Sequence, residues 1–276
     1  MLKKRIPKIL GIALAVIFLI VIIFPFYWQV ITSFKDPLDI SKMPTEIWPS
    51  RFSTYFYESV IVKHNFGRYL WNSVIVAGVT MLLCIVVAMP AAYAFARVHF
   101  TAKGFWRTFI LVANMFPIIA VVTPLFIQFK KMHLINTYWG LIIPSIVISL
   151  PLAIWTLVAF LEKIPIDLEH AAQVDGATRF QSVYKIILPL ATPGIFSTAI
   201  IAFITTWNEF MFALIFTTKP TMRTVPVAIA MFPGEFTVPW GDMAAASILA
   251  TLPIVIVVIL CQKYIVAGLT AGAVKG

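Results

Sequence analysis

The chain has 276 residues, of which 61% are hydrophobic and 12% are charged, whereas soluble domains are roughly half apolar and a quarter charged. This composition, with a mean hydropathy of +0.96, excludes an ordinary soluble protein and indicates a membrane protein with several spans. The net charge of +10 does not call for nucleic acid as a partner, because basic residues on the inner face of a membrane lie beside anionic lipid.

Six continuous apolar runs are each long enough to cross a hydrocarbon core of about 30 Å as a helix of about 20 residues. A strand-type barrel is not expected, because the runs do not alternate between polar and apolar residues. The predicted fold class is therefore an all-α polytopic membrane protein, with a six-helix transmembrane domain over residues 9–267. The expected spans are residues 9–34, 69–96, 108–129, 134–161, 190–216 and 243–265.

The N-terminal tail, residues 1–8, carries Lys3, Lys4, Arg5 and Lys8. The span that follows is too long for a cleaved secretion signal, and no small-residue cleavage site comes after it, so we expect it to be retained. Six spans place both termini on one side. With the tail in the cytoplasm, the inner segments hold twelve Lys and Arg residues against nine in the outer ones, which favours cytoplasmic termini by a modest margin.

The first outer loop, residues 35–68, is rich in proline and aromatic residues. It could dock a partner outside the membrane, or it could rest on lipid headgroups through its aromatic side chains. The sequence leaves both readings open.

The inner segment at residues 162–189 is long and polar, unlike the short turns between the other spans. Asp167 is placed to cap a first helix, and Gly176 supplies a break after it. Thr178 and Gln181 then form a T-x-x-Q capping box for a second helix. The prediction is a short helix-turn-helix that stands off the membrane.

The second helix of this segment has one apolar face. Phe180, Val183, Tyr184 and Ile187 recur at the spacing i, i+3, i+4 and i+7, and Pro189 is expected to end the helix. From the residues alone, the segment could either dock a partner or fold back on its own membrane domain.

Glu209 is the one acid within an expected span. A carboxylate in hydrocarbon is costly and marks a transport pathway or a buried partner. With Trp207 and Asn208 it offers an aromatic face and hydrogen-bonding groups to a transported solute, and Asn114 is a weaker candidate for the same pathway. The alternative is a structural pairing with an outer-loop Lys or Arg or with a companion subunit.

The chain offers no catalytic or metal chemistry of its own. It lacks the G-x-x-x-x-G-K-[ST] phosphate loop as well as the common zinc and serine-hydrolase motifs. Cys84 and Cys261 lie within apolar runs, where free cysteine behaves as a small hydrophobe, so neither a disulfide framework nor a metal site is expected. We therefore expect no bound cofactor and no enzymatic activity.

A resemblance to a known family is carried by three stretches of the chain. The sequence EHAAQVDGA at residues 169–177 resembles the EAA loop of ATP-binding-cassette importer permeases, and WNEF at 207–210 and GLTAGAVKG at 268–276 look like the carbohydrate branch of that family. The likeness implies a type I-like importer fold and the second membrane subunit of a maltose- or trehalose-type sugar transporter. It also implies a bacterial or archaeal cytoplasmic membrane.

The same resemblance implies the partners and the coupling residues. They would be a second, different permease subunit, two copies of a cytoplasmic ATPase that hold ATP and Mg, and an extracytoplasmic sugar-binding protein. The residues implied to couple the chain to the ATPase are Glu169, His170, Ala171, Ala172, Asp175 and Gly176. In the tail, residues 268–276, Lys275 and Gly276 are implied to contact the ATPases.

One position departs from the family pattern. His170 occupies the place directly before Ala171 and Ala172 where the family has a glutamate that pairs with a basic residue of the ATPase, and the acid lies one place earlier, at Glu169. Either Glu169 takes over that pairing, or docking rests on shape.

Two other functions remain as alternatives. An ion-coupled secondary transporter would be expected to carry several intramembrane carboxylates or an internal repeat, and the chain shows one such acid and no obvious repeat. An importer permease of the same family for a solute other than sugar is the second alternative.

Overall fold

The computed structural model describes residues 6–40, 42–232 and 238–273, and these residues form helices without any strand. Two compact units make up the chain. One holds residues 1–67 and 229–252, and the other holds residues 68–228 and 253–276.

The first unit contains α1 (Ile6–Ser33), the short α2 (Tyr55–Glu58), the π-helical turn η2 (Ser59–Lys63) and the start of α12 (Trp240–Ala273). Gly241 allows α12 to approach α2 closely, because a Cβ there would lie 2.2 Å from the ring of Phe56. The outer loop is held by Lys35, whose buried ammonium donates a 2.7 Å hydrogen bond to the carbonyl of Glu46. Trp48 and Phe52 in that loop are exposed, so both readings of the loop stay open.

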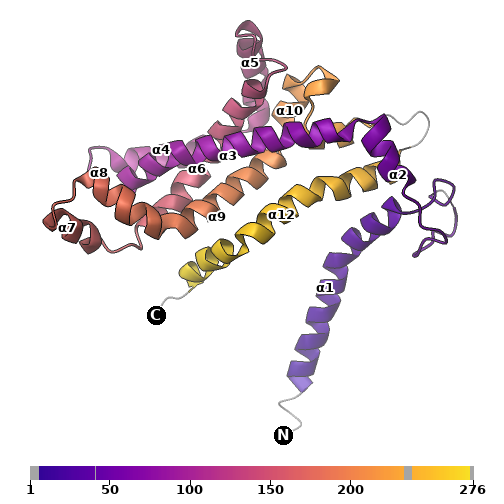
Figure 1. Ribbon diagram of the computed structural model, residues 1–276, viewed down its shortest axis with the longest axis horizontal. Coiled ribbons are helices and arrows are strands. Elements are labelled where there is room, and N and C mark those ends of the chain that lie inside the picture. Colours follow the sequence, from indigo (N-terminus) through magenta and orange to yellow (C-terminus); the bar gives the residue numbers. More distant parts are fainter. Residues whose placement is uncertain (1–5, 41, 233–237, 274–276) are drawn as a thin grey trace. The chain divides into compact units, whose positions relative to one another are not determined.

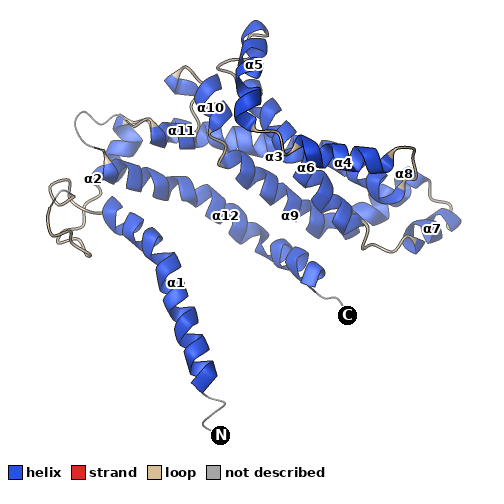
Figure 2. Cartoon of the chain, turned by 180° about the vertical axis from the view of Figure 1, so that it is seen from behind, coloured by secondary structure: helices blue, strands red, loops and turns tan. Residues whose placement is uncertain are grey.

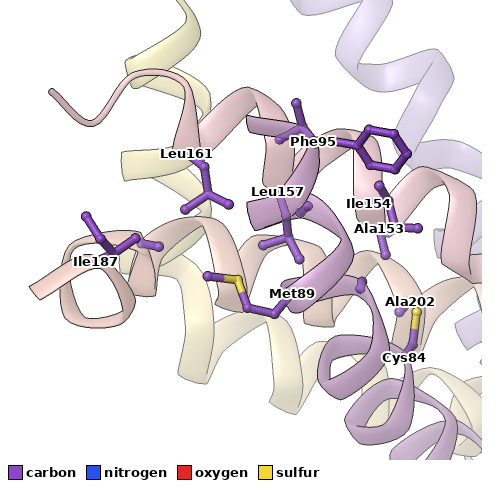
Figure 3. Close-up of a cluster of buried hydrophobic side chains, with 13 residues drawn as sticks. Cys84, Met89, Phe95, Ala153, Ile154, Leu157, Leu161, Ile187 and Ala202 are labelled. Atoms are coloured by element: carbon purple, nitrogen blue, oxygen red, sulfur yellow. The ribbon is translucent and has the colours of Figure 1, made fainter. Parts of the chain in front are cut away.

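The second unit is built on three long helices. These are α3 (Phe66–Arg97), α6 (Tyr138–Leu161) and α9 (Leu188–Trp207), and a cluster of buried apolar side chains from all three forms its core (Figure 3). The remaining helices are α4 (Lys103–Ala113), α5 (Ile118–Lys131), α7 (Asp167–Val174), α8 (Arg179–Ser182), the π-helical turn η3 (Val183–Ile187), α10 (Met211–Phe216), the 3₁₀ turn η4 (Pro220–Met222) and α11 (Val225–Ala230).

Helices α7 and α8 lie at one end of this second unit, and α10 lies at the other (Figures 1 and 2). Near the end that carries α10, Asn72 of α3 donates hydrogen bonds to the carbonyls of Thr221 and Arg223 and accepts one from the hydroxyl of Tyr138. This buried amide therefore joins separate segments, as intramembrane amides commonly do.

Four of the six predicted spans, 9–34, 69–96, 134–161 and 243–265, coincide with long apolar helices, whereas the other two are not single helices. Five helical segments among the described residues are long and apolar enough to cross a membrane, or six if the bent pair α4 and α5 counts as one span. The prediction of one continuous helix over residues 108–129 is wrong, because α4 and α5 meet at 89°. Pro117 lies at this break with extended backbone (ψ 122°), and a proline disfavours helical geometry in the residue before it.

The fifth span also differs from the prediction. Pro189 does not end the preceding helix, since α8, η3 and α9 run on as one helical segment from Arg179 to Trp207. The π-helical turn widens the helix just before Pro189, which lacks an N–H and would otherwise crowd the preceding turn. The segment then ends at Trp207, and α10 is a separate helix, so residues 190–216 are not one helix.

At the C-terminus, α12 continues to Ala273. Residues 268–273 are therefore helical instead of forming a tail beyond the last span. Lys275 and Gly276 lie outside the described residues, and their contact with an ATPase stays a prediction.

Candidate functional site

The predicted helix-turn-helix is present, and its turn is built on Gly176. Gly176 has a φ of +88°, a region that glycine enters freely and L-residues enter only at a cost. Its N–H donates to the carbonyl of Gln173, and the N–H of Ala177 donates to that of Ala172 over 2.9 Å. These two bonds form a Schellman motif, which satisfies the last carbonyls of α7.

The start of α8 is fixed by the predicted capping box. The hydroxyl of Thr178 accepts from the backbone N–H of Gln181 (3.2 Å), and the amide oxygen of Gln181 accepts from the backbone N–H of Thr178 (2.9 Å). The predicted cap at Asp167 is wrong, because Asp167 is the first residue of α7 and Ile166 precedes it without a side-chain cap. Its carboxylate still lies in the first turn, where negative charge is favourable.

The surface of this helix-turn-helix combines small, apolar and polar residues. His170, Ala171 and Asp175 are exposed, and Val174 is 87% exposed. The turn between α7 and α8 is therefore accessible to another protein at the end of the second unit.

The predicted apolar face of the second helix divides into two parts. Ile187 is buried in the core, whereas Phe180 (79% exposed) and Tyr184 (65% exposed) remain on the surface, with their rings parallel to within 5° and centroids 6.5 Å apart. The segment thus packs against its own unit and also leaves apolar rings uncovered, so each of the two readings from the sequence describes part of it.

Glu169 faces into the unit. It is only 5% exposed, and its carboxylate accepts hydrogen bonds from the hydroxyl of Tyr93 (Oε2, 2.8 Å) and from Nε of Arg97 (Oε1, 2.8 Å). Arg97 also donates from Nη2 to the carbonyl of Ile164, just before α7. The last turn of α3 and the start of α7 are therefore joined by a buried ion pair.

His170 and Glu169 thus have opposite environments. The side chain in the family's acid position, His170, is exposed, while the acid beside it is buried and engaged on both oxygens. An assignment of Glu169 to a partner protein stays a prediction, and it would require Glu169 to give up both hydrogen bonds.

A second ion pair lies at the same end of the unit. Nη2 of Arg107, in α4, lies 2.8 Å from Oε1 of Glu162, just after α6, and also donates to the carbonyl of Phe95. Both charged side chains are partly exposed. The pair therefore connects the ends of α4 and α6 near solvent.

At the opposite end, Glu209 caps α10. Its carboxylate accepts from the backbone N–H groups of Phe212 (2.8 Å) and Ala213 (3.0 Å), which otherwise lack partners at the start of a helix. Neither sequence reading, a sugar contact or a pairing with a cation, anticipated this backbone role.

The other pathway candidates are not gathered around Glu209 as a ligand site. Trp207 is buried, with its ring stacked on Phe203 at 5.6 Å, and the amide of Asn208 donates to the carbonyl of Ile204. Asn114 is exposed at the break between α4 and α5. Their contact with sugar stays a prediction, but the buried indole of Trp207 presents no face on the surface of this chain.

A cavity that the sequence gave no sign of lies within the first unit. Its volume is about 410 Å³. It is lined by Trp28, Gln29, Thr32, Lys35, Ile40, Thr45, Trp240, Met243, Ala244 and Ser247. Indoles, an amide and hydroxyls are the groups that bind sugar rings, but these residues come from three separate segments, so their proximity could not be read from spacing.

Tyr93 and Arg97 are functional candidates that sequence reasoning missed. They lie four residues apart near the end of α3, on one face of a helix, and this polar pair at the end of an apolar run was the available signal. Among the described residues, no group of three or more His, Cys, Asp or Glu side chains could hold a metal ion.

Comparison with known proteins places the chain in a family. Residues 84–271 match the family described as binding-protein-dependent transport system inner membrane component. The trehalose/maltose transport system permease protein MalG of Thermococcus litoralis is 42% identical over 99% of this chain and 98% of its own length. The trehalose transport system permease protein SugB of Mycobacterium tuberculosis is 44% identical over 83% of this chain and 84% of its own.

A solved structure has the same fold. A chain from a bacterial ABC transporter involved in the import of the acidic polysaccharide alginate superposes with a TM-score of 0.80 at 19% identity, over 95% of this chain and 97% of that chain. The chain therefore belongs to the family of binding-protein-dependent transport system inner membrane components, the permease subunits of ATP-binding-cassette importers.

Proposed function

We propose that this chain forms half of the translocation pathway of an ATP-driven importer for a disaccharide or oligosaccharide. The observation that carries the proposal is the helix-turn-helix of α7 and α8, which leaves small and apolar residues exposed at one end of a helical membrane unit. Such an element is suited to being held by another protein. Two relatives of the chain are named as permeases, one for trehalose and maltose and one for trehalose, which supports sugar as the substrate class.

The proposed assembly contains a second, different permease subunit, two copies of a cytoplasmic ATPase and an extracytoplasmic sugar-binding protein. ATP and Mg would be held by the ATPases. Both termini would lie in the cytoplasm of a bacterium or archaeon, so that α7 and α8 face the ATPases. Closure of two ATPase subunits on ATP would then displace the helix-turn-helix as a rigid lever, which is a two-state switch of the kind seen in domain closure.

We further propose that the cavity beside Trp28 and Trp240 contacts sugar on its way into the membrane. The indole of Trp240 and the neighbouring amide and hydroxyl groups would supply an apolar face and hydrogen bonds to a sugar ring, while the ring of Trp28 also holds the Lys35 ammonium 4.8 Å from its centroid. The cavity of about 410 Å³ falls within the range of small-ligand sites. Trp207, Asn208, Glu209 and Asn114 remain the other candidates.

The experiment is uptake of labelled maltose and trehalose by proteoliposomes. The complete complex with its binding protein is compared with the permease subunits alone, with and without ATP. We expect uptake only with the ATPase and ATP present. Uptake by the permease subunits without the ATPase would overturn the proposal in favour of an ion-coupled transporter, and ATP-dependent uptake of other solutes but no sugar would overturn the substrate class.

A further inference from the structure

We infer that Glu169 is a positioning residue that, with Arg97 and Tyr93, joins α3 to the helix-turn-helix of α7 and α8, which we call the coupling element. Glu169 is then not the acid presented to the ATPase. This inference rests on the proposed function, because it concerns how the motion of α7 reaches the membrane helices.

Glu169, Arg97 and Tyr93 form a buried polar contact within the chain, which we call the joint. The Arg97 and Glu169 side chains are 9% and 6% exposed, with Nε and Oε1 2.8 Å apart. Tyr93, one turn earlier on α3, takes the second carboxylate oxygen at 2.8 Å. Charge-assisted hydrogen bonds of this length are the strong ones, and removing one partner of a buried pair leaves an uncompensated charge.

Arg97 holds α7 at more than one point. Besides Glu169 within the helix, it binds the carbonyl of Ile164 in the connection that leads to α7. Ala172, three residues after Glu169, is also buried. The first turn of α7 is thus fixed to the last turn of α3 on both sides of Ile166.

Two routes then lead from α7 into the second unit. One follows the chain through Gly176 into α8, η3 and α9, which form one helical segment. The other leaves the chain and crosses to α3 through the Arg97–Glu169 pair, 72 positions apart in sequence. A displacement of α7 would reach α9 along the backbone and α3 indirectly through the shared apolar core, whereas the Arg97–Glu169 pair transmits it to α3 directly.

An exposed role for Glu169 fits the geometry poorly. To meet a basic residue of another protein, the carboxylate would have to leave both Tyr93 and Arg97, which would strand the guanidinium in a buried position. His170 and Asp175 already face outward. The surface of α7 that a partner can reach therefore does not include the Glu169 carboxylate.

The test measures coupling in the complete reconstituted transporter as sugar molecules taken up per ATP hydrolysed. We expect Arg97→Ala and Glu169→Gln each to lower this ratio several-fold, while the ATPase still co-purifies in normal amount. Glu162→Gln is the matched control, since it removes a carboxylate paired with an arginine at the same end of the unit but near solvent. Its ratio should stay within twofold of the wild type.

A double-mutant cycle separates a joint from two independent effects. If Arg97 and Glu169 act through each other, Arg97→Ala with Glu169→Ala should couple no worse than the more severe single variant, and exchanging the charges by Arg97→Glu with Glu169→Arg should recover part of the ratio. Arg97→Lys and Tyr93→Phe keep most of the side-chain bulk, so they test the joint if the alanine variants fail to accumulate.

Two results would overturn the inference. One is loss of ATPase co-purification on changing Glu169 but not on changing Arg97, which would make Glu169 a docking acid. The other is normal coupling in the Arg97 variants. If Gly176→Pro uncouples transport while the Arg97 variants do not, the inference about the Arg97–Glu169 pair is wrong, but the helix-turn-helix still couples transport to ATP hydrolysis. If Gly176→Pro has no effect either, the proposed function of the helix-turn-helix is wrong.

Discussion

Gly176 is the residue on which the shape of the coupling element depends most directly. Its φ of +88° closes the Schellman motif after α7, and a Cβ there would meet no atom within 4 Å. The demand is therefore conformational and not steric. An L-residue in this region costs about 1 kcal/mol or more, and proline cannot enter it because its φ is fixed near −65°.

We expect Gly176→Asn to retain most of the coupling between ATP hydrolysis and sugar uptake, and Gly176→Val to lose much of it. Gly176→Pro should uncouple the two while the transporter is still present in the normal amount. The measurement is sugar taken up per ATP hydrolysed. Gly78→Ala is the matched control, since Gly78 lies in α3 with an equally open Cβ direction and without a positive φ. Equal uptake by the Asn and Pro variants would show that the turn is not part of the coupling element.

Glu209 is a second residue whose part is set by local geometry. Because its carboxylate satisfies two backbone N–H groups of α10, Glu209→Ala should cost about 1 kcal/mol of stability, seen as a lower midpoint of thermal unfolding. Glu209→Gln keeps one acceptor and should retain uptake and substrate preference. A changed preference among maltose, trehalose and longer sugars would instead place Glu209 in the sugar pathway.

At the scale of elements, α9 packs tightly against α6 at Gly194. A Cβ on Gly194 would lie 2.5 to 2.9 Å from atoms of the Phe160 side chain, so there is no room for a larger residue. Overpacking of this kind costs about 1 to 3 kcal/mol.

We expect Gly194→Val to lower the thermal midpoint and the yield of assembled transporter, and Phe160→Ala in the same chain to restore part of both. Gly78→Ala again serves as the control. A Gly194→Val variant as stable as the wild type would mean that α6 and α9 can separate without loss.

The elements that could be predicted from the sequence are those fixed by hydropathy and by local caps. The long spans at α1, α3, α6 and α12 and the capping box at Thr178 follow from residue type alone. The breaks at residues 114–117 and 208–210 were not predicted, because each lies between apolar stretches and membrane helices tolerate single prolines and polar residues without ending. The prediction that Pro189 ends the helix was also wrong, because a π-helical turn before Pro189 lets the helix continue through the proline.

At the scale of the whole molecule, family membership was predictable because one short motif and two further stretches carry it between residues 169 and 276. The contacts that set the working geometry were not. Arg97 meets Glu169, and Asn72 meets Thr221 and Arg223, across about 70 to 150 positions, and no local pattern encodes such pairings. For this reason the sequence predicted the fold class but not the buried contacts of Glu169 with Arg97 and Tyr93.

The substrate class belongs to this same scale, and the cavity of the first unit offers its sharpest test. Removing an aromatic stacking partner costs about 1 kcal/mol, so Trp28→Ala should raise the KM for sugar uptake several-fold and leave ATP hydrolysis in the absence of sugar unchanged. Trp28→Phe keeps an aromatic ring and should fall between the two. Trp71→Ala is the matched control, because Trp71 is an exposed indole of α3 outside the cavity. If Trp28→Ala and Trp71→Ala give the same KM as the wild type, sugar does not bind in this cavity. Glu209 and Asn114 would then remain as candidates for contact with the sugar.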